Sequence, residues 1–185
     1  MTATSKHTTA EVTMIFRLTQ ELARRTKQPT LPLLPLCVNP YADWSAHIFP
    51  AGRIRLILVV NSVSLYPAIF PAKGITSGTA LVHEAMQALR ATMYATGDLA
   101  LFEKMVAPDA ASVQFSTVGN RRLTGSMNEM AKIALVQMYY RCQSPFDAGR
   151  HLTDTIMSYI GNDFPVEVFR TMHKQGMPRE SPQHP

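Results

Sequence analysis

The clearest alternation of hydrophobic and polar residues covers residues 43–71, where it predicts three short strands joined by two tight turns. Residues 56–60 form an unbroken apolar run of branched side chains, which is typical of a strand covered on both faces. Gly52 supplies the positive φ that a short hairpin loop needs, so the first two strands should pair antiparallel. Pro67 has no amide proton, so the third strand should be an edge strand or carry a bulge. Trp44 is in phase with the inward positions and is expected in the core.

Further strands and helices are expected on both sides of this stretch. The pattern predicts strands at 12–18 and 111–118, and helices with their caps at about 19–27, 79–97, 98–106, 144–161 and 165–174. Arg24, Arg25 and Lys27 lie near the C-terminal end of the first of these helices. That position suits cations, and we interpret the cluster as a solvated helix end rather than a phosphate site.

Between the first helix and the first hairpin strand, prolines recur at positions that exclude a helix and favour an extended strap. Pro32 and Pro35 have the spacing of a ligand for aromatic-grooved recognition modules. The leucines between the prolines favour a strap that lies against the body of the protein.

The sharpest local signal is a capping box at Ser126 and Glu129, which places the start of a helix at Ser126 and its end near residue 140. Arg121 and Arg122 would then stand in the turn between a strand and this helix. The amides of a helix N-terminus and two guanidinium groups can face the same anion, so this pair is a candidate binding site.

Together these elements predict an α+β fold with one small, mainly antiparallel sheet of about five strands, packed by helices from the C-terminal half of the chain. Residues 12–174 are expected to form a single domain. Residues 1–11 are expected to be a flexible leader and residues 175–185 a disordered tail.

Composition favours a basic cytoplasmic protein. Of the 185 residues 46% are hydrophobic, which is ample for a core. The two cysteines fit a reducing compartment, and no apolar run resembles a secretory signal or a membrane span. A formal net charge of +5 permits association with nucleic acid or an acidic protein partner.

Candidate chemistry is sparse. Cys37 and Cys142 lack the flanking residues of a reactive thiol, and no glycine-rich phosphate loop is present. His151 and Asp154 share one helical face, a spacing that often arises by chance. We therefore expect no catalytic residue, no metal site and no cofactor, and a non-catalytic role is favoured while an enzymatic one stays open.

A second candidate binding site lies at the start of the middle hairpin strand. Arg53 and Arg55 alternate there, with His47 opposite on the neighbouring strand. If this face is open, Tyr66 and Phe70 would be stacking platforms in a cationic patch suited to single-stranded nucleic acid. If helices cover the face, the arginines only mark the solvated end of the strand, and this second interpretation is favoured.

Three segments carry a family resemblance: MIFRLTQELARR (14–25), NPYADWSAHIFPAGR (39–53) and RRLTGSMNEMA (121–131). In this order they resemble an uncharacterised bacterial family, a domain of unknown function. The resemblance covers most of the chain from residue 14 to about residue 160. It implies one small domain from a bacterium or its mobile elements, and it brings no activity or catalytic residue.

Two functions remain open. The first is a non-catalytic binding or regulatory domain that recruits nucleic acid or an acidic protein through Arg53, Arg55, Arg121, Arg122 and His47. The alternative is a small hydrolase or transferase with a pocket near His47, Asp43 and His151. The absence of a catalytic constellation in the sequence favours the first.

Overall fold

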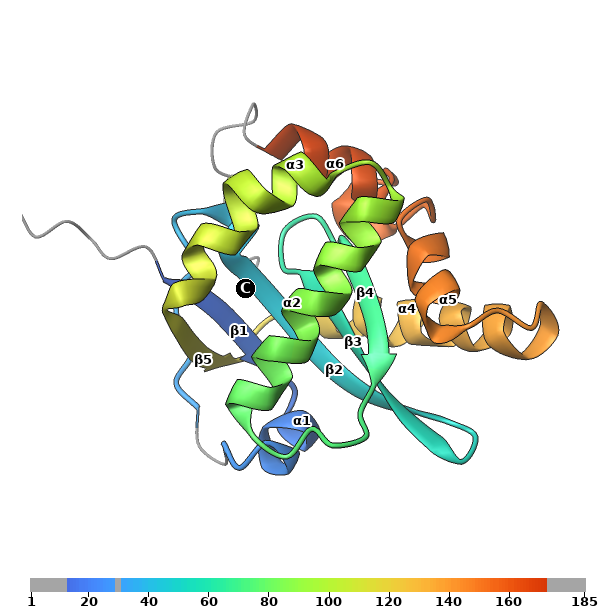
Figure 1. Cartoon of the computed structure of the whole chain (residues 1–185), viewed down its shortest axis with the longest axis horizontal. Coiled ribbons are helices and arrows are strands. Elements are labelled where there is room, and N and C mark those ends of the chain that lie inside the picture. The colour runs from blue at the N-terminus through green and yellow to red at the C-terminus, as the bar shows by residue number, and fades with distance from the viewer. Residues whose placement is uncertain (1–12, 29–30, 173–185) are drawn as a thin grey trace, which may run out of the picture.

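A computed structural model describes residues 13–28 and 31–172 (Figure 1). The strands are β1 (Met14–Leu18), β2 (Asp43–Ala51), β3 (Ile54–Asn61), β4 (Pro67–Pro71) and β5 (Val113–Thr117). The α-helices are α1 (Gln20–Arg25), α2 (Gly78–Ala95), α3 (Leu99–Leu101), α4 (Arg121–Tyr140), α5 (Pro145–Leu152) and α6 (Pro165–Thr171). Short 3₁₀ or π turns are η1 (Pro40–Ala42), η2 (Phe102–Val106), η3 (Ala107–Ala111) and η4 (Ser158–Ile160). The leader and tail predicted from the sequence lie outside the described residues.

The strands form one sheet in the order β4-β3-β2-β1-β5. The predicted α+β class and five-stranded sheet are confirmed, but the sheet is mixed rather than mainly antiparallel. β3 is antiparallel to β2 and β4, whereas β1 is parallel to both β2 and β5. Turn residues in the sequence mark a hairpin, because its two strands are adjacent in the chain. Parallel strands are distant in the chain, so the alternation of hydrophobic and polar residues does not show which strands pair in parallel.

Helices cover both faces of the sheet. On the first face, which Figure 1 views through α2, a core cluster contains Phe16, Trp44 and Phe169. On the second face, α4 and α5 enclose a separate cluster that includes Leu58 and Met127. Successive residues of a strand point to opposite faces, so one apolar strand such as β3 can serve both clusters.

The hairpin predictions are confirmed in detail. Gly52, between β2 and β3, has a φ of +63°. Pro67 opens β4, which is an edge strand of the sheet. Because an edge strand leaves one row of amides outside the ladder, the missing proton of Pro67 costs little there.

The predicted helix start at Ser126 is wrong. α4 begins at Arg121, and the side-chain oxygen of Asn120 accepts hydrogen bonds from the amides of Arg122 (2.9 Å) and Leu123 (3.2 Å). Asn120 therefore caps the helix more than a turn earlier. Ser126 is a buried position within the helix, and its spacing to Glu129 is coincidental.

The helix predicted for 144–161 also differs from the structure. Ser144 caps α5 as expected, by accepting a hydrogen bond from the amide of Asp147 (3.1 Å), but the helix ends at Leu152. The chain then turns back on itself, and Met157 pairs with Asp163 in an isolated bridge. Within the described part of the chain, no helix is long and apolar enough to span a membrane.

Trp44 is the largest fully buried side chain of the first cluster, and its ring centroid lies 6.0 Å from that of Phe169. Trp44→Ala should destabilise the fold by about 3 to 5 kcal/mol, because it leaves a cavity between the sheet and α6. Thermal unfolding measures the loss. Tyr94→Ala is the matched control, because Tyr94 is 73% exposed on α2. Equal melting temperatures for the two variants would contradict this packing.

Candidate functional site

A salt bridge between Arg17 of β1 and Asp43 of β2 is buried in the second face of the sheet. Arg17 Nε donates to Asp43 Oδ1 and Arg17 Nη2 donates to Asp43 Oδ2, each at 2.7 Å. The two side chains are 6% and 1% exposed. In the parallel pairing of β1 with β2, Arg17 lies opposite Ser45 and Asp43 lies opposite Ile15, so Arg17 and Asp43 are diagonal neighbours on one face of the sheet. The planar guanidinium meets the carboxylate edge to edge.

The same two side chains hold the proline-rich strap. Arg17 donates to the carbonyl oxygens of Leu34 (2.8 Å) and Pro35 (2.7 Å), and the amide of Cys37 donates to Asp43 Oδ2 (2.9 Å). The strap therefore lies against the body, as expected. Leu31 packs against the first core cluster, whereas Leu33 and Leu36 remain 66% and 55% exposed. Hydrogen bonds to the strap backbone therefore add to the apolar contact of Leu31.

Arg17 has no donor left for a ligand. Its fifth N–H faces Ser116 Oγ of β5 at 3.4 Å, and Ser116 Oγ in turn donates to the carbonyl of Pro32 at 3.1 Å. All five guanidinium donors thus have partners within the protein. The cluster joins two parallel strand pairs and the strap, so its role is structural.

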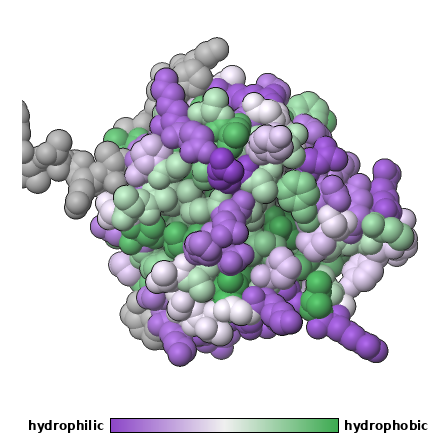
Figure 2. All heavy atoms as spheres, in the orientation of Figure 1, coloured by the Kyte–Doolittle hydropathy of each residue, from purple (hydrophilic) through white to green (hydrophobic). Residues whose placement is uncertain are grey.

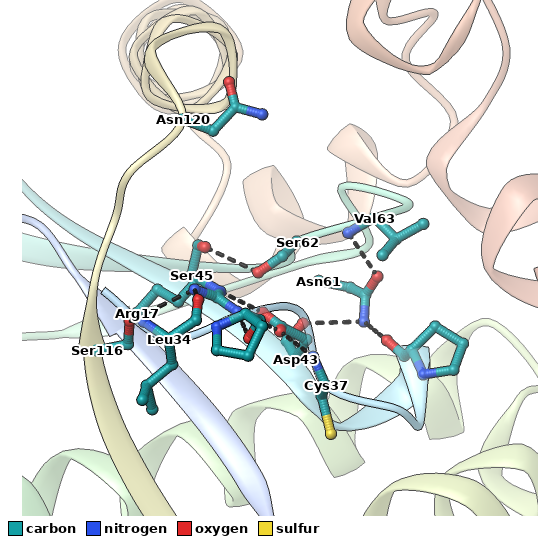
Figure 3. Close-up of polar contacts among 12 residues, drawn as sticks. Arg17, Leu34, Cys37, Asp43, Ser45, Asn61, Ser62, Val63, Ser116 and Asn120 are labelled. Carbon is teal, nitrogen blue, oxygen red and sulfur yellow. Dashed lines mark hydrogen bonds and ion pairs between the residues drawn. The ribbon is translucent and has the colours of Figure 1, made fainter. Parts of the chain in front are cut away.

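Further hydroxyl groups continue this polar face towards α4 (Figure 3). Ser45 Oγ and Ser62 Oγ are 2.8 Å apart, and both residues are buried. The Tyr159 hydroxyl donates to the carbonyl of Ser62 (3.2 Å) and lies 3.4 Å from Asn120 Nδ2 at the start of α4. Burial raises the pKa of Tyr159, which keeps it protonated.

This hydroxyl network lacks the parts of a nucleophilic site. The carboxylate beside it, Asp43, is committed to Arg17, and no histidine in the described residues is hydrogen-bonded to the network. Cys37 is half-buried with its Sγ 3.3 Å from the carbonyl of Thr13, and burial raises its pKa, which disfavours the thiolate. These hydrogen bonds tie β2, the loop after β3, η4 and the start of α4 together.

A depression of about 420 Å³ opens on the first face, between α1 and the β2–β3 hairpin. We call it the basic depression, and its lining residues are Glu21, Arg24, Arg25, Ile48 and Arg55. α1 contributes its charged side because Leu22 and Ala23 turn inwards to the core. The cluster on α1 interpreted from the sequence as a solvated helix end is therefore part of a concave surface.

The cations of the basic depression are only partly neutralised. Arg55 pairs with Glu21, and both side chains are nearly half exposed. Arg25 Nη2 donates to the carbonyl of Ala72 (2.7 Å), while its buried Nε has no partner among the described residues. Arg24 is exposed and forms no ion pair within the described chain.

Other cations extend this charge. Lys27 and Arg53 are exposed and lie within two residues of lining residues in the chain. Lys73 is also exposed and follows Ala72, whose carbonyl accepts the hydrogen bond from Arg25. In Figure 2, hydrophilic side chains along the lower edge of the same face stand among residues of intermediate and hydrophobic character. The six cations and Glu21 give this region a net charge of five, as large as that of the whole chain.

The residues predicted around Arg53 and Arg55 are only partly brought together. Both arginines are exposed, but Tyr66 and Phe70 are 0% and 6% exposed and are not stacking platforms. His47 points to the second face, where its ring stacks near Phe49 with centroids 6.3 Å apart. Burial lowers the pKa of His47, so it adds no cation at neutral pH.

Arg121 and Arg122 form a separate region. They lie exposed in the first turn of α4. The hairpin turn lies against the other end of that helix, because a Cβ on Gly52 would meet the hydroxyl of Tyr139. A helix of 20 residues is about 30 Å long. The two predicted arginine pairs therefore do not form one site.

The alternative pocket near His47, Asp43 and His151 is not formed. Asp43 is buried in its salt bridge, and His151 is exposed on α5, which packs against β4 at the opposite edge of the sheet from β5. No three His, Cys, Asp or Glu residues of ranges 13–28 and 31–172 lie close enough together to hold a metal ion.

The fold and its surface define a small α+β domain with a clamped strap and a basic depression. A family model described as a domain of unknown function, DUF6933, matches residues 15–168, and the chain belongs to this family. The expectation that the chain belongs to a family of unknown function is thereby confirmed. No curated protein and no solved structure matches the chain.

The buried salt bridge predicts a large cost for removing one charge. Asp43→Asn should destabilise the protein by about 3 to 5 kcal/mol, because it leaves the Arg17 guanidinium buried without a counter-charge. Urea unfolding measures this difference. Glu103→Gln is the control, since its pair with Arg90 is exposed and should contribute less than about 1 kcal/mol. An Asp43→Asn variant as stable as this control would show that the pair is dispensable.

Proposed function

We propose that this domain is a non-catalytic binding module that recruits an anionic partner, nucleic acid or an acidic protein segment, through the basic depression. The observation that carries the proposal is the convergence of Arg24, Arg25 and Arg55 on one open hollow with a single acid. Phosphate and carboxylate oxygens are the groups that clustered guanidinium donors bind best.

Binding would require little rearrangement. An exposed ion pair such as Arg55–Glu21 contributes at most about 1 kcal/mol, so an incoming anion can compete for Arg55. An anion can bind Arg24 and Arg53 without displacing a carboxylate, since neither arginine forms an ion pair in the described chain. The hydrogen bond from Arg25 to the carbonyl of Ala72 orients this side chain, which lines the basic depression.

Arg121 and Arg122 remain a competing site. Two observations make them weaker candidates. The Asn120 side chain already occupies the amides of Arg122 and Leu123 at the helix start. Arg24 and Arg25 line the basic depression, and neither Arg121 nor Arg122 is among its lining residues.

Charge reversal at the two sites separates them. Arg24→Glu with Arg53→Glu should abolish retention on heparin, because it removes unpaired cations from the rim of the depression. Arg121→Glu with Arg122→Glu makes the same change in net charge and should leave retention close to wild type after correction for that charge. Wild-type affinity should also fall steeply with salt, and the slope should drop by about one for each anionic group that a variant no longer neutralises.

The opposite pattern, with loss only in the Arg121 and Arg122 variant, would move the site to the start of α4. A wild-type protein without salt-dependent retention would refute the binding function itself.

A further inference from the structure

Exposed aromatic side chains stand at the C-terminal end of α4. Tyr139 and Tyr140 are 57% and 83% exposed, and Val136, one turn earlier on the same side, is 49% exposed. Residues three and four apart neighbour one another on a helix, so the three side chains form one strip. We call this strip the tyrosine edge.

The tyrosine edge adjoins the β2–β3 hairpin. A Cβ on Gly52 would lie only 2.9 Å from the Tyr139 hydroxyl, so the ring touches the hairpin turn. Arg53 follows directly and is exposed, and Arg55 beyond it lines the basic depression. The hairpin, which projects at the lower right of Figure 1, therefore connects the depression on one face with two exposed phenol rings on the other.

The charges beside the tyrosine edge favour an anionic occupant. Lys132 lies one turn before Val136 and Arg141 directly follows Tyr140, and both are exposed. Arg53 closes the strip at the hairpin. One acid, Glu129, lies a further turn back along the helix. A strip of rings bordered by cations matches a ligand that carries flat apolar faces and negative charge together.

We propose that the anionic partner is single-stranded nucleic acid, whose phosphates follow the basic depression and the hairpin while its bases stack on Tyr139 and Tyr140. This inference rests on the proposed function and specifies its ligand. In a single strand the base faces are free to stack, whereas in a duplex they are hidden. An acidic peptide would use the cations and leave the rings without a role.

The test compares a ligand with bases and one without. Fluorescence anisotropy with a labelled oligodeoxythymidylate gives the Kd, and heparin retention reports the cations alone. Tyr139→Ala with Tyr140→Ala should weaken oligonucleotide binding at least about fivefold per stacked base and leave heparin retention unchanged. Tyr139→Phe with Tyr140→Phe keeps the rings and should stay within about twofold of wild type.

Tyr140→Ala alone guards against a disturbed hairpin, because Tyr140 is the more exposed ring and Tyr139 makes the contact at Gly52. It should also weaken oligonucleotide binding while the melting temperature stays unchanged. If the alanine variants bind the oligonucleotide as well as wild type while Arg24→Glu with Arg53→Glu does not, the binding function stands and the inferred stacking on the tyrosine edge is wrong. Wild-type protein that is retained on heparin but does not bind the oligonucleotide would also overturn the inference. Alanine variants that lose both heparin retention and oligonucleotide binding would overturn it as well.

Discussion

The buried pair of Arg17 and Asp43 is the constraint on which one half of the structure depends. Ionised groups lose several kcal/mol each when they leave water, and only close pairing with further hydrogen bonds compensates this loss. Here the compensation needs β1, β2, β5 and the strap at once, because each supplies an acceptor or donor to the pair. The parallel half of the sheet and the strap are therefore ordered together.

The pair also divides the second face of the sheet. Under α4 and α5 the face is apolar, with Leu58 and Met127 in one cluster. Over β1 and β5 it is polar, and the strap rather than a helix covers it. The outer surfaces of α1 and the hairpin carry exposed cations, and the end of α4 carries the exposed rings of Tyr139 and Tyr140. The proposed binding surface lies on these three elements, outside both regions.

The sequence predicts what is local. Gly52 and Pro67 are turn and edge signals that act within a few residues, and both were confirmed. The parallel pairs were missed because the partners of the salt bridge are 26 residues apart and no turn motif joins them. One signal did exist: Arg17 interrupts the otherwise apolar strand MIFRL, and a buried arginine needs a carboxylate.

The candidate site shows the same limit. Arg53 and Arg55 were recognised from their alternation, but Arg24 and Arg25 joined them only through the packing of α1 on the hairpin. The prediction from the capping box at Ser126 failed because Asn120, an equally good cap residue, stands six residues earlier in the chain and caps the helix there. The exposure of Tyr139 and Tyr140 could not be predicted from the sequence, because the start of their helix was placed at the wrong residue.

Hydrogen exchange of the strap tests the central claim most directly. If Arg17 and Asp43 hold the strap, the amides of Leu34 and Cys37, which donate to Ser116 Oγ and Asp43 Oδ2, should exchange orders of magnitude more slowly than in an unstructured peptide. The amide of Val38, whose residue is 84% exposed, is the internal control for fast exchange. Exchange of Leu34 and Cys37 as fast as that of Val38 would contradict the account.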